Sequence, residues 1–207
     1  MQRRIALMVG VMAALVCAGR VSAQESAPRA GSVVVTVIPV GATFFTQSQS
    51  GKEPGFTNYG PGGDVELYLS HYLRVEGEVG GGIGVSQELD GANGVSHRTS
   101  PSLVTYSGNV VVTAPSDGSL APYLTIGAGG LTLLRTSALG IASSKTFVTG
   151  NVGAGVKWFN ATARWGVRAD YRFIAVHADD QAPGLFGREA RYANRAYGAL
   201  LVNVGRQ

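Results

Sequence analysis

Hydrophobic and polar residues alternate one by one along much of this chain, most regularly between Ala163 and Phe173. Because successive side chains of a β-strand point to opposite faces, the alternation predicts a strand with one charged and one apolar face. The charged face would carry Arg164, Arg168, Asp170 and Arg172, and the apolar face Trp165, Val167, Ala169, Tyr171 and Phe173. Such a strand suits a soluble sheet with its apolar face covered, or a transmembrane barrel with lipid outside and a polar interior.

Strand-like segments recur along the chain. They span residues 31–46, 62–70, 72–85, 102–113, 122–135, 146–159, 162–176 and 193–206. The links after the second, fourth and sixth segments are short, whereas those at 47–61, 86–101, 136–145 and 177–192 are long and polar. An even strand number, with short periplasmic turns and long extracellular loops, is typical of bacterial outer-membrane barrels. The pattern predicts an all-β, antiparallel, up-and-down transmembrane barrel of eight strands with both termini periplasmic.

The same alternation predicts which charged side chains point into the barrel. An eight-stranded barrel is only wide enough for its own side chains to fill it, and charges buried there must pair. The third and seventh strands lie opposite each other in such a closure, so we expect Glu76 and Glu78 to pair with Arg168 and Arg172. The predicted charge network, which would plug the lumen, comprises Asp64, Glu66, Arg74, Glu76, Glu78, Lys157, Arg164, Arg168, Asp170 and Arg172.

Apolar residues on the opposite faces would contact lipid. They are mostly aliphatic: Val65, Leu67, Leu69, Leu73, Val75, Val79, Val104, Tyr106, Val110, Val112, Leu200, Val202 and Val204. Aromatic residues gather near the predicted strand ends, as two interfacial girdles would require. The predicted girdles comprise Phe44, Phe45, Tyr68, Tyr72, Tyr123, Trp158, Phe159 and Trp165.

The first 23 residues have the composition of a secretory signal peptide. Arg3 and Arg4 form a positive start, residues 5–17 are apolar, and residues 21–23 resemble a small-residue cleavage site. The apolar run is shorter than the about 20 residues that a membrane-spanning helix needs. We therefore expect a signal-peptide helix at 1–23, cleavage between Ala23 and Gln24, and one barrel domain at 24–207.

Removing that segment changes the charge and the cysteine content. The chain has 17 basic and 13 acidic residues, and the loss of Arg3, Arg4 and Arg20 would leave 14 basic ones. This near balance does not indicate a nucleic-acid surface. Cys17 is the only cysteine and would leave as well, so no disulfide framework is expected.

Candidate chemistry is sparse. His71, His97 and His177 fall in separate links, which does not suit a metal site, so neither a metal nor a cofactor is expected. A serine–histidine site would need a serine near His97 and an orienting acid, and no G-x-S-x-G motif occurs. The pair Glu76 and Glu78 resembles a general acid/base pair but is more simply two lumen charges on one strand face. We expect no enzymatic activity.

The chain resembles the eight-stranded outer-membrane proteins of the OmpA and OmpX type. The resemblance rests on the signal segment, the strand number, the alternation of turns and loops, and segments such as residues 73–80. It implies an integral protein of the bacterial outer membrane, inserted by the barrel assembly machinery and in contact with membrane lipid and lipopolysaccharide. In one respect the chain departs from this type, since residues 200–207 lack the aromatic residue on which such proteins usually end.

Several functions stay open at this level. The favoured one is a structural or interaction role, with the extracellular loops meeting an outside partner. The link at 179–192, with Leu185 and Phe186 between acidic and basic residues, is the most distinctive surface segment. It is read first as a variable exposed loop and second as a contact for lipopolysaccharide, a host surface or a partner protein. The alternatives are a narrow channel for small solutes and a lipid A-modifying membrane enzyme. The rival fold is a soluble β-sandwich or lipocalin-like barrel, whose inward face would be apolar.

Overall fold

The computed structural model describes residues 28–48, 54–91, 94–115, 119–134, 144–177 and 190–205. The predicted signal peptide, with its cleavage site between Ala23 and Gln24, lies outside these residues, as does the tip of the link at 179–192. The strands are β1 (Val33–Phe45), β2 (Phe56–Tyr68), β3 (Leu73–Gly84), β4 (Ser86–Gly91), β5 (Gly94–Thr99), β6 (Leu103–Thr113), β7 (Leu120–Leu133), β8 (Lys145–Phe159), β9 (Trp165–Val176) and β10 (Arg191–Asn203).

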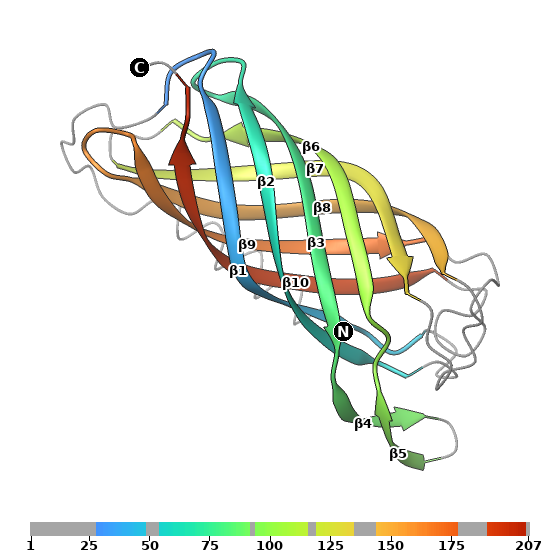
Figure 1. Ribbon diagram of the computed structural model, residues 1–207. Coiled ribbons are helices and arrows are strands. Elements are labelled where there is room, and N and C mark those ends of the chain that lie inside the picture. Colours follow the sequence, from blue (N-terminus) through green and yellow to red (C-terminus); the bar gives the residue numbers. More distant parts are fainter. Residues whose placement is uncertain are drawn as a thin grey trace.

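Eight of these strands form one closed barrel in the order β1-β10-β9-β8-β7-β6-β3-β2, as Figure 1 shows. Every neighbouring pair is antiparallel, and the pairing of β1 with β10 closes the wall. The predicted eight-stranded antiparallel barrel is therefore confirmed. In the part of the chain that the structure describes, no helix is long and apolar enough to cross a membrane.

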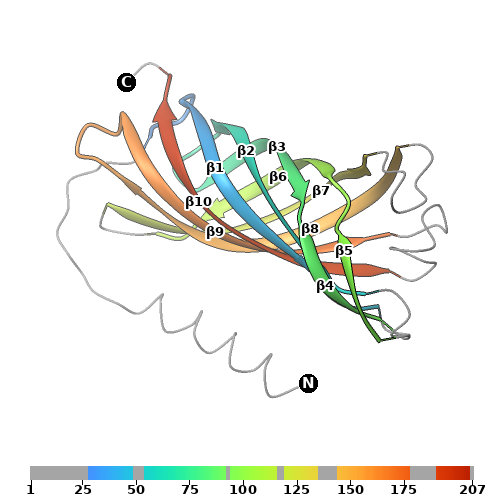
Figure 2. The same ribbon diagram turned by 60° about the horizontal axis from the view of Figure 1, so that its bottom comes forward.

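The remaining two strands, β4 and β5, pair with each other in a separate two-stranded sheet. They continue β3 and β6 beyond the rim of the barrel and project from it (Figure 2). The sequence predicted only a long polar link at 86–101. Its polar, glycine-containing composition gave no alternation of apolar and polar residues, because both faces of a projecting hairpin can be polar.

Most predicted strand boundaries differ from the observed ones by a few residues, and the starts of β2 and β9 differ by three residues or more. β2 begins at Phe56, six residues before the predicted start at residue 62, because Gly60 and Pro61 suggest a loop by composition although they lie within the strand. β9 begins at Trp165 rather than residue 162, since a turn with a positive φ of 51° at Ala163 precedes it.

The alternation of faces follows the predicted pattern in the barrel strands. The burial of β3 alternates without exception from Leu73 to Gly82. Among the predicted outward residues, the exposed ones are Val65, Leu67, Leu69, Leu73, Val75, Val79, Tyr106, Val110, Val112, Leu200, Val202 and Val204. An apolar outer wall around buried charges is the reverse of a lipocalin-like barrel, so the rival soluble fold is wrong.

Inside the barrel, two apolar clusters lie on either side of a band of charges. The cluster at the loop rim consists of Phe45, Phe56, Leu103, Leu131, Leu133, Phe147, Ile174, Val176 and Ala193. The cluster at the turn rim consists of Val34, Tyr68, Phe159 and Leu201. The charged side chains between them are almost completely buried, so water reaches them little from either end.

Candidate functional site

Arg168 lies at the centre of the charged band. It is inward-facing on β9 and only 2% exposed. Its Nη1 donates to Asp64 Oδ2 at 3.0 Å, to Glu66 Oε1 at 3.1 Å and to Glu76 Oε2 at 2.8 Å. Its Nη2 donates to Asp170 Oδ2 at 2.7 Å. One guanidinium thus ties β9 to β2 and β3 on the opposite wall of the barrel.

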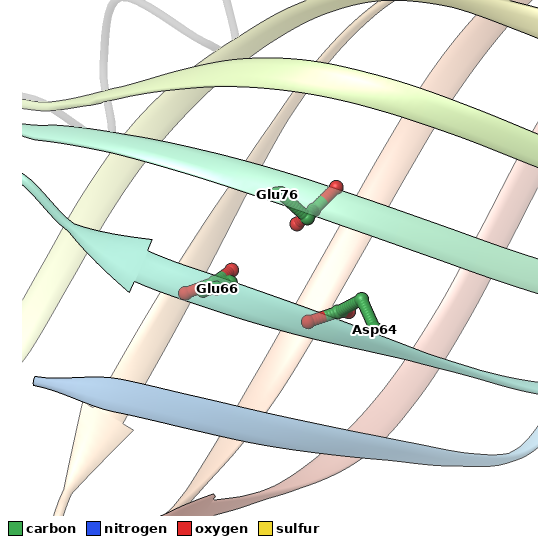
Figure 3. Close-up of side chains that lie close together, drawn as sticks. All are labelled: Asp64, Glu66 and Glu76. Carbon is green, nitrogen blue, oxygen red and sulfur yellow. The ribbon is translucent and has the colours of Figure 1, made fainter. Parts of the chain in front are cut away.

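The three carboxylates that share Arg168 Nη1 form a compact group. Asp64 and Glu66 follow each other on the inner face of β2, and Glu76 lies on the neighbouring strand β3, as Figure 3 shows. One oxygen from each lies within 4.8 Å of the others, a spacing that could hold a metal ion. Here the chain's own cations fill that role, because Arg168 contacts all three carboxylates and the Lys157 ammonium group contacts both oxygens of Glu66.

Arg172, two inward positions further along β9, extends the network toward the loop rim. Its Nη2 lies 2.7 Å from Glu76 Oε1 and 3.3 Å from Glu78 Oε2, and its Nε donates to Asp170 at 3.0 Å. The structure thus brings Glu76 to both Arg168 and Arg172, and Glu78 to Arg172. Among the residues that the structure describes, Arg168 forms no ion pair with Glu78.

Arg195 on β10 is a member that the sequence reasoning missed. Its Nη1 contacts Glu78, and its guanidinium lies 4.9 Å from the ring centroid of Tyr197. Tyr197 itself donates to Glu78 at 3.1 Å. The period-2 pattern could have revealed both residues, because Arg191, Arg195 and Tyr197 fall on the same inward face of β10.

Arg74 is held mostly by aromatic rings. Its Nη1 donates to the Tyr68 hydroxyl at 3.3 Å, and its guanidinium lies 5.0 Å and 5.5 Å from the ring centroids of Tyr68 and Tyr123. Its closest carboxylate is that of Glu66, 3.7 Å from Nε. Cation–π contacts of this kind gain strength away from water, so they stabilise Arg74 where ion pairing is weak.

Within the network, acidic and basic residues are equal in number: Asp64, Glu66, Glu76, Glu78 and Asp170 face Arg74, Lys157, Arg168, Arg172 and Arg195. Arg191 is also buried but lies nearer the loop rim, where its Nη2 donates to the carbonyl oxygens of Thr46 and Pro54. Burying an unpaired charge is costly, and removing one partner of a buried pair destabilises strongly. Loss of any one of these charges would therefore leave a buried partner unpaired.

Arg164 does not join the network, contrary to prediction. It lies in the turn before β9 and its side chain is exposed. The alternation around Arg168 continues in sequence to Arg164, but the strand does not, because the turn at residues 160–164 changes the direction of the side chain.

The predicted aromatic girdles are also corrected. Phe44 and Trp165 are exposed on the outer face, and Tyr72 is exposed in the turn before β3. The half-buried Trp158 packs edge-on against Trp165, with ring centroids 5.4 Å apart. The remaining four predicted members point inward: Phe45, Tyr68, Tyr123 and Phe159. Adjacent aromatics on one strand cannot both face outward, so only one residue of each of the pairs Phe44–Phe45 and Trp158–Phe159 could belong to a girdle.

Tyr123 shows what the inward tyrosines do instead. Its hydroxyl donates to Asp170 and accepts from Arg168 Nε at 2.6 Å. The ring also lies 5.4 Å from Lys157 Nζ, measured to its centroid. Tyr123 therefore acts as a bridge inside the charge network.

A small cavity separates the charged band from the apolar cluster at the loop rim. It has a volume of about 30 Å³, and its polar lining includes Glu78, Thr105, Thr149, Asn151, Arg172 and Arg195. A polar space of this size is large enough for water.

Comparison with known proteins agrees with this architecture. The crystal structure of Neisserial surface protein A is similar, with a TM-score of 0.57 at 13% identity, covering 84% of this chain and 97% of that one. Yersinia pestis Ail, crystallised with the heparin analogue sucrose octasulfate, gives a TM-score of 0.52 at 12% identity, with 84% and 99% coverage. Pseudomonas aeruginosa OprG gives 0.51 at 9% identity, with 88% and 100% coverage.

At these identities the structural likeness shows the fold alone. No curated protein sequence matches the chain significantly. The family described as "Outer membrane protein beta-barrel domain" matches residues 9–194, which is most of the chain. The chain therefore belongs to the outer membrane protein beta-barrel domain family.

Proposed function

We propose that this outer-membrane protein is a closed, non-enzymatic barrel with a structural or interaction role exerted through its loop rim. The observation that carries the proposal is the Arg168-centred network, which crosses the lumen from β9 to β2 and β3. A barrel that carried solutes along its axis would need a continuous polar path. Here the mid-lumen side chains are paired to one another and an apolar cluster lies beyond them at each rim.

The loop rim is the proposed interaction face. It carries the projecting hairpin of β4 and β5 and the longer links, whereas β2–β3 and β8–β9 are joined by short turns. Loops held on a rigid scaffold are common sites of recognition. We propose that this rim is extracellular, that both termini are periplasmic, and that the partner is lipopolysaccharide or a molecule outside the cell. Outer-membrane insertion would require the barrel assembly machinery.

Conductance across planar bilayers tests the closed lumen. The purified, folded protein should give no stepwise current above the lipid background, because the paired charges leave no axial path. The Arg168→Ala variant should conduct intermittently if the network is what closes the barrel. Regular single-channel steps from the native protein would overturn the proposal and favour the narrow channel.

Binding to lipopolysaccharide tests the loop rim. A variant in which residues 86–99 are replaced by a two-residue turn keeps all barrel strands and removes β4 and β5. It should bind lipopolysaccharide-containing vesicles more weakly than the native protein, with equal binding to phospholipid vesicles as the control. Unchanged binding would exclude the hairpin from the interaction. A change in the mass of lipid A when the protein is overexpressed would instead favour a lipid A-modifying membrane enzyme.

A further inference from the structure

A short chain of side-chain amides connects the charge network to the wall formed by β6, β7 and β8. Asn109 Nδ2 on β6 donates to Glu76 Oε1 at 2.7 Å, and Asn151 Nδ2 on β8 donates to Asn109 Oδ1 at 3.0 Å. The strand between them contributes Gly127, which pairs with both asparagines. A Cβ on Gly127 would lie 1.9 Å from Asn109 Oδ1, so glycine here gives the amides room to meet across β7.

The carboxylate of Glu76 sets the direction of both amides. Glu76 is paired with Arg168 and Arg172, and an ionised carboxylate only accepts hydrogen bonds. Asn109 must therefore turn its NH₂ group toward Glu76 and its oxygen toward β8, and Asn151 must turn its own NH₂ group toward Asn109. The atom left at the end of the chain is Asn151 Oδ1, which is an acceptor.

This last acceptor needs a donor. Asn151 Oδ1 is buried and, among the residues that the structure describes, has no hydrogen-bond partner. Most buried polar atoms in folded proteins are paired, either with another protein group or with ordered water. Thr149, the next inward residue of β8 toward the loop rim, is 7% exposed, and its hydroxyl has no partner among the described residues either.

Both residues line the cavity of about 30 Å³ that lies below the apolar cluster at the loop rim. Since Asn151 Nδ2 is bonded to Asn109, Oδ1 is the amide atom that remains for this cavity. Leu131 and Ile174 line the cavity as well and belong to the apolar cluster, which separates it from the loop rim. The remaining polar side chains of the lining are Glu78, Thr105, Ser107, Arg172 and Arg195.

The charges of the lining decide which ligand the cavity suits. Glu78 contacts both Arg172 and Arg195, so these three groups are already paired. A cation in the cavity would lie against two guanidiniums, and an anion would lie against Glu78 and the oxygen of Asn151. Water is neutral and both donates and accepts, and the cavity exceeds the about 10–15 Å³ that one water molecule needs.

We propose that this cavity is a binding site for one resident water molecule, which donates to Asn151 Oδ1, bonds to the Thr149 hydroxyl and joins the amide chain to the Arg195–Glu78 pair. The water completes the network on the wall of β6, β7 and β8, where Gly127 and Gly129 of β7 offer no side chain. This goes beyond the proposed function, because it concerns how the lumen is held together and not what the loop rim binds.

Crystallography of the purified, folded protein tests the site directly, with crystals soaked in sodium bromide or rubidium chloride. The proposal predicts one solvent peak within about 3.2 Å of Asn151 Oδ1, with no anomalous signal from either ion. A bromide or rubidium peak in the cavity would overturn the assignment to water. So would a protein donor on Asn151 Oδ1, or a cavity without a solvent peak.

A pair of valine variants tests the site through stability. Thr149→Val removes a hydroxyl that the water would bond to and nearly keeps the shape of the side chain. Thr125→Val is the matched control, because Thr125 on β7 is 2% exposed, its Oγ1 has no partner among the described residues, and it does not line the cavity.

The two variants should differ in sign. Thr149→Val should raise the equilibrium constant of unfolding about fivefold, the usual effect of one lost hydrogen bond, in urea titrations of the barrel in lipid vesicles. Thr125→Val should leave the constant unchanged or lower it, because it removes a buried hydroxyl that has no partner to lose. If Thr149→Val is no more destabilising than Thr125→Val, the proposed water is wrong. Neither measurement depends on conductance or on lipopolysaccharide binding, so failure of this site and failure of the proposed function are distinguishable.

Discussion

The Nη1 atom of Arg168 lies 2.8 Å from Oε2 of Glu76, which joins β9 to β3 through the centre of the barrel. The two residues are separated by 92 positions in the sequence, and both are buried. Glu76 also contacts Arg172 and accepts a hydrogen bond from Asn109 Nδ2 at 2.7 Å. One carboxylate therefore satisfies two guanidiniums and one amide, which makes it the acidic counterpart of the Arg168 hub.

Replacing Glu76 tests how much its contacts with Arg168 and Arg172 contribute to the free energy of unfolding. Glu76→Ala leaves Arg168 and Arg172 short of a partner in a buried site, so the free energy of unfolding should fall by about 3–5 kcal/mol. Urea unfolding of the barrel in lipid vesicles, followed by tryptophan fluorescence, would measure it. The outward neighbour provides the control, since Val75→Ala removes only lipid-facing surface. A loss well under about 1 kcal/mol would show that the site is solvated.

The carboxylates around Arg168 lead to a prediction about metal ions. In an Arg168→Met variant, Asp64, Glu66 and Glu76 would lose the guanidinium that all three contact. Oxygen ligands from three carboxylates suit Ca²⁺, so added Ca²⁺ should raise the unfolding midpoint of the variant by mass action. The native protein should show no such rise. An equal response of both proteins would mean that the ion acts elsewhere, for example on the lipid.

Gly60 is predicted to tolerate no side chain. A Cβ at this position would lie 1.9 Å from the carbonyl oxygen of Gly81, where β2 and β3 approach closely. Gly60→Ala should therefore cost about 1–3 kcal/mol of unfolding free energy, because backbone must move. Gly77→Ala is the matched control, since a Cβ there meets nothing within 4 Å. Equal stability of the two variants in urea would contradict the close approach.

The chain terminus carries a prediction that depends on the sequence alone. If residues 1–23 are a signal peptide, the protein isolated from the outer membrane should begin at Gln24. Intact mass and N-terminal sequencing measure this directly. Retention of Cys17 in the isolated protein would contradict cleavage at Ala23.

The barrel was predictable because lipid outside and charge inside impose a strict two-residue period. Glu76 and Arg168 could be assigned to the lumen from that period, and the antiparallel closure placed their strands on opposite walls. The period applies only where a strand exists, which is why Arg164, in the turn before β9, was assigned wrongly.

Other features depend on information that the period does not contain. Tyr68 and Tyr123 combine an apolar ring with a hydroxyl, so composition alone could not distinguish an interfacial girdle from a bridge between buried charges. The start of β2 was concealed by Gly60 and Pro61, because the pairing of residues 56–60 with β1 is a contact between distant parts of the sequence. The hairpin of β4 and β5 lies in a stretch whose polar, glycine-containing composition predicts a loop.

The most direct test of the central claim, that Arg168 and Glu76 are coupled across the lumen, is a double-mutant cycle. The unfolding free energies of the native protein, Glu76→Gln, Arg168→Met and the double variant would be measured in the same vesicles. The structure predicts a coupling free energy of about 1–3 kcal/mol, because the two side chains are in contact and share a network. Additive effects, with coupling below about 0.3 kcal/mol, would contradict a paired network at the centre of the barrel.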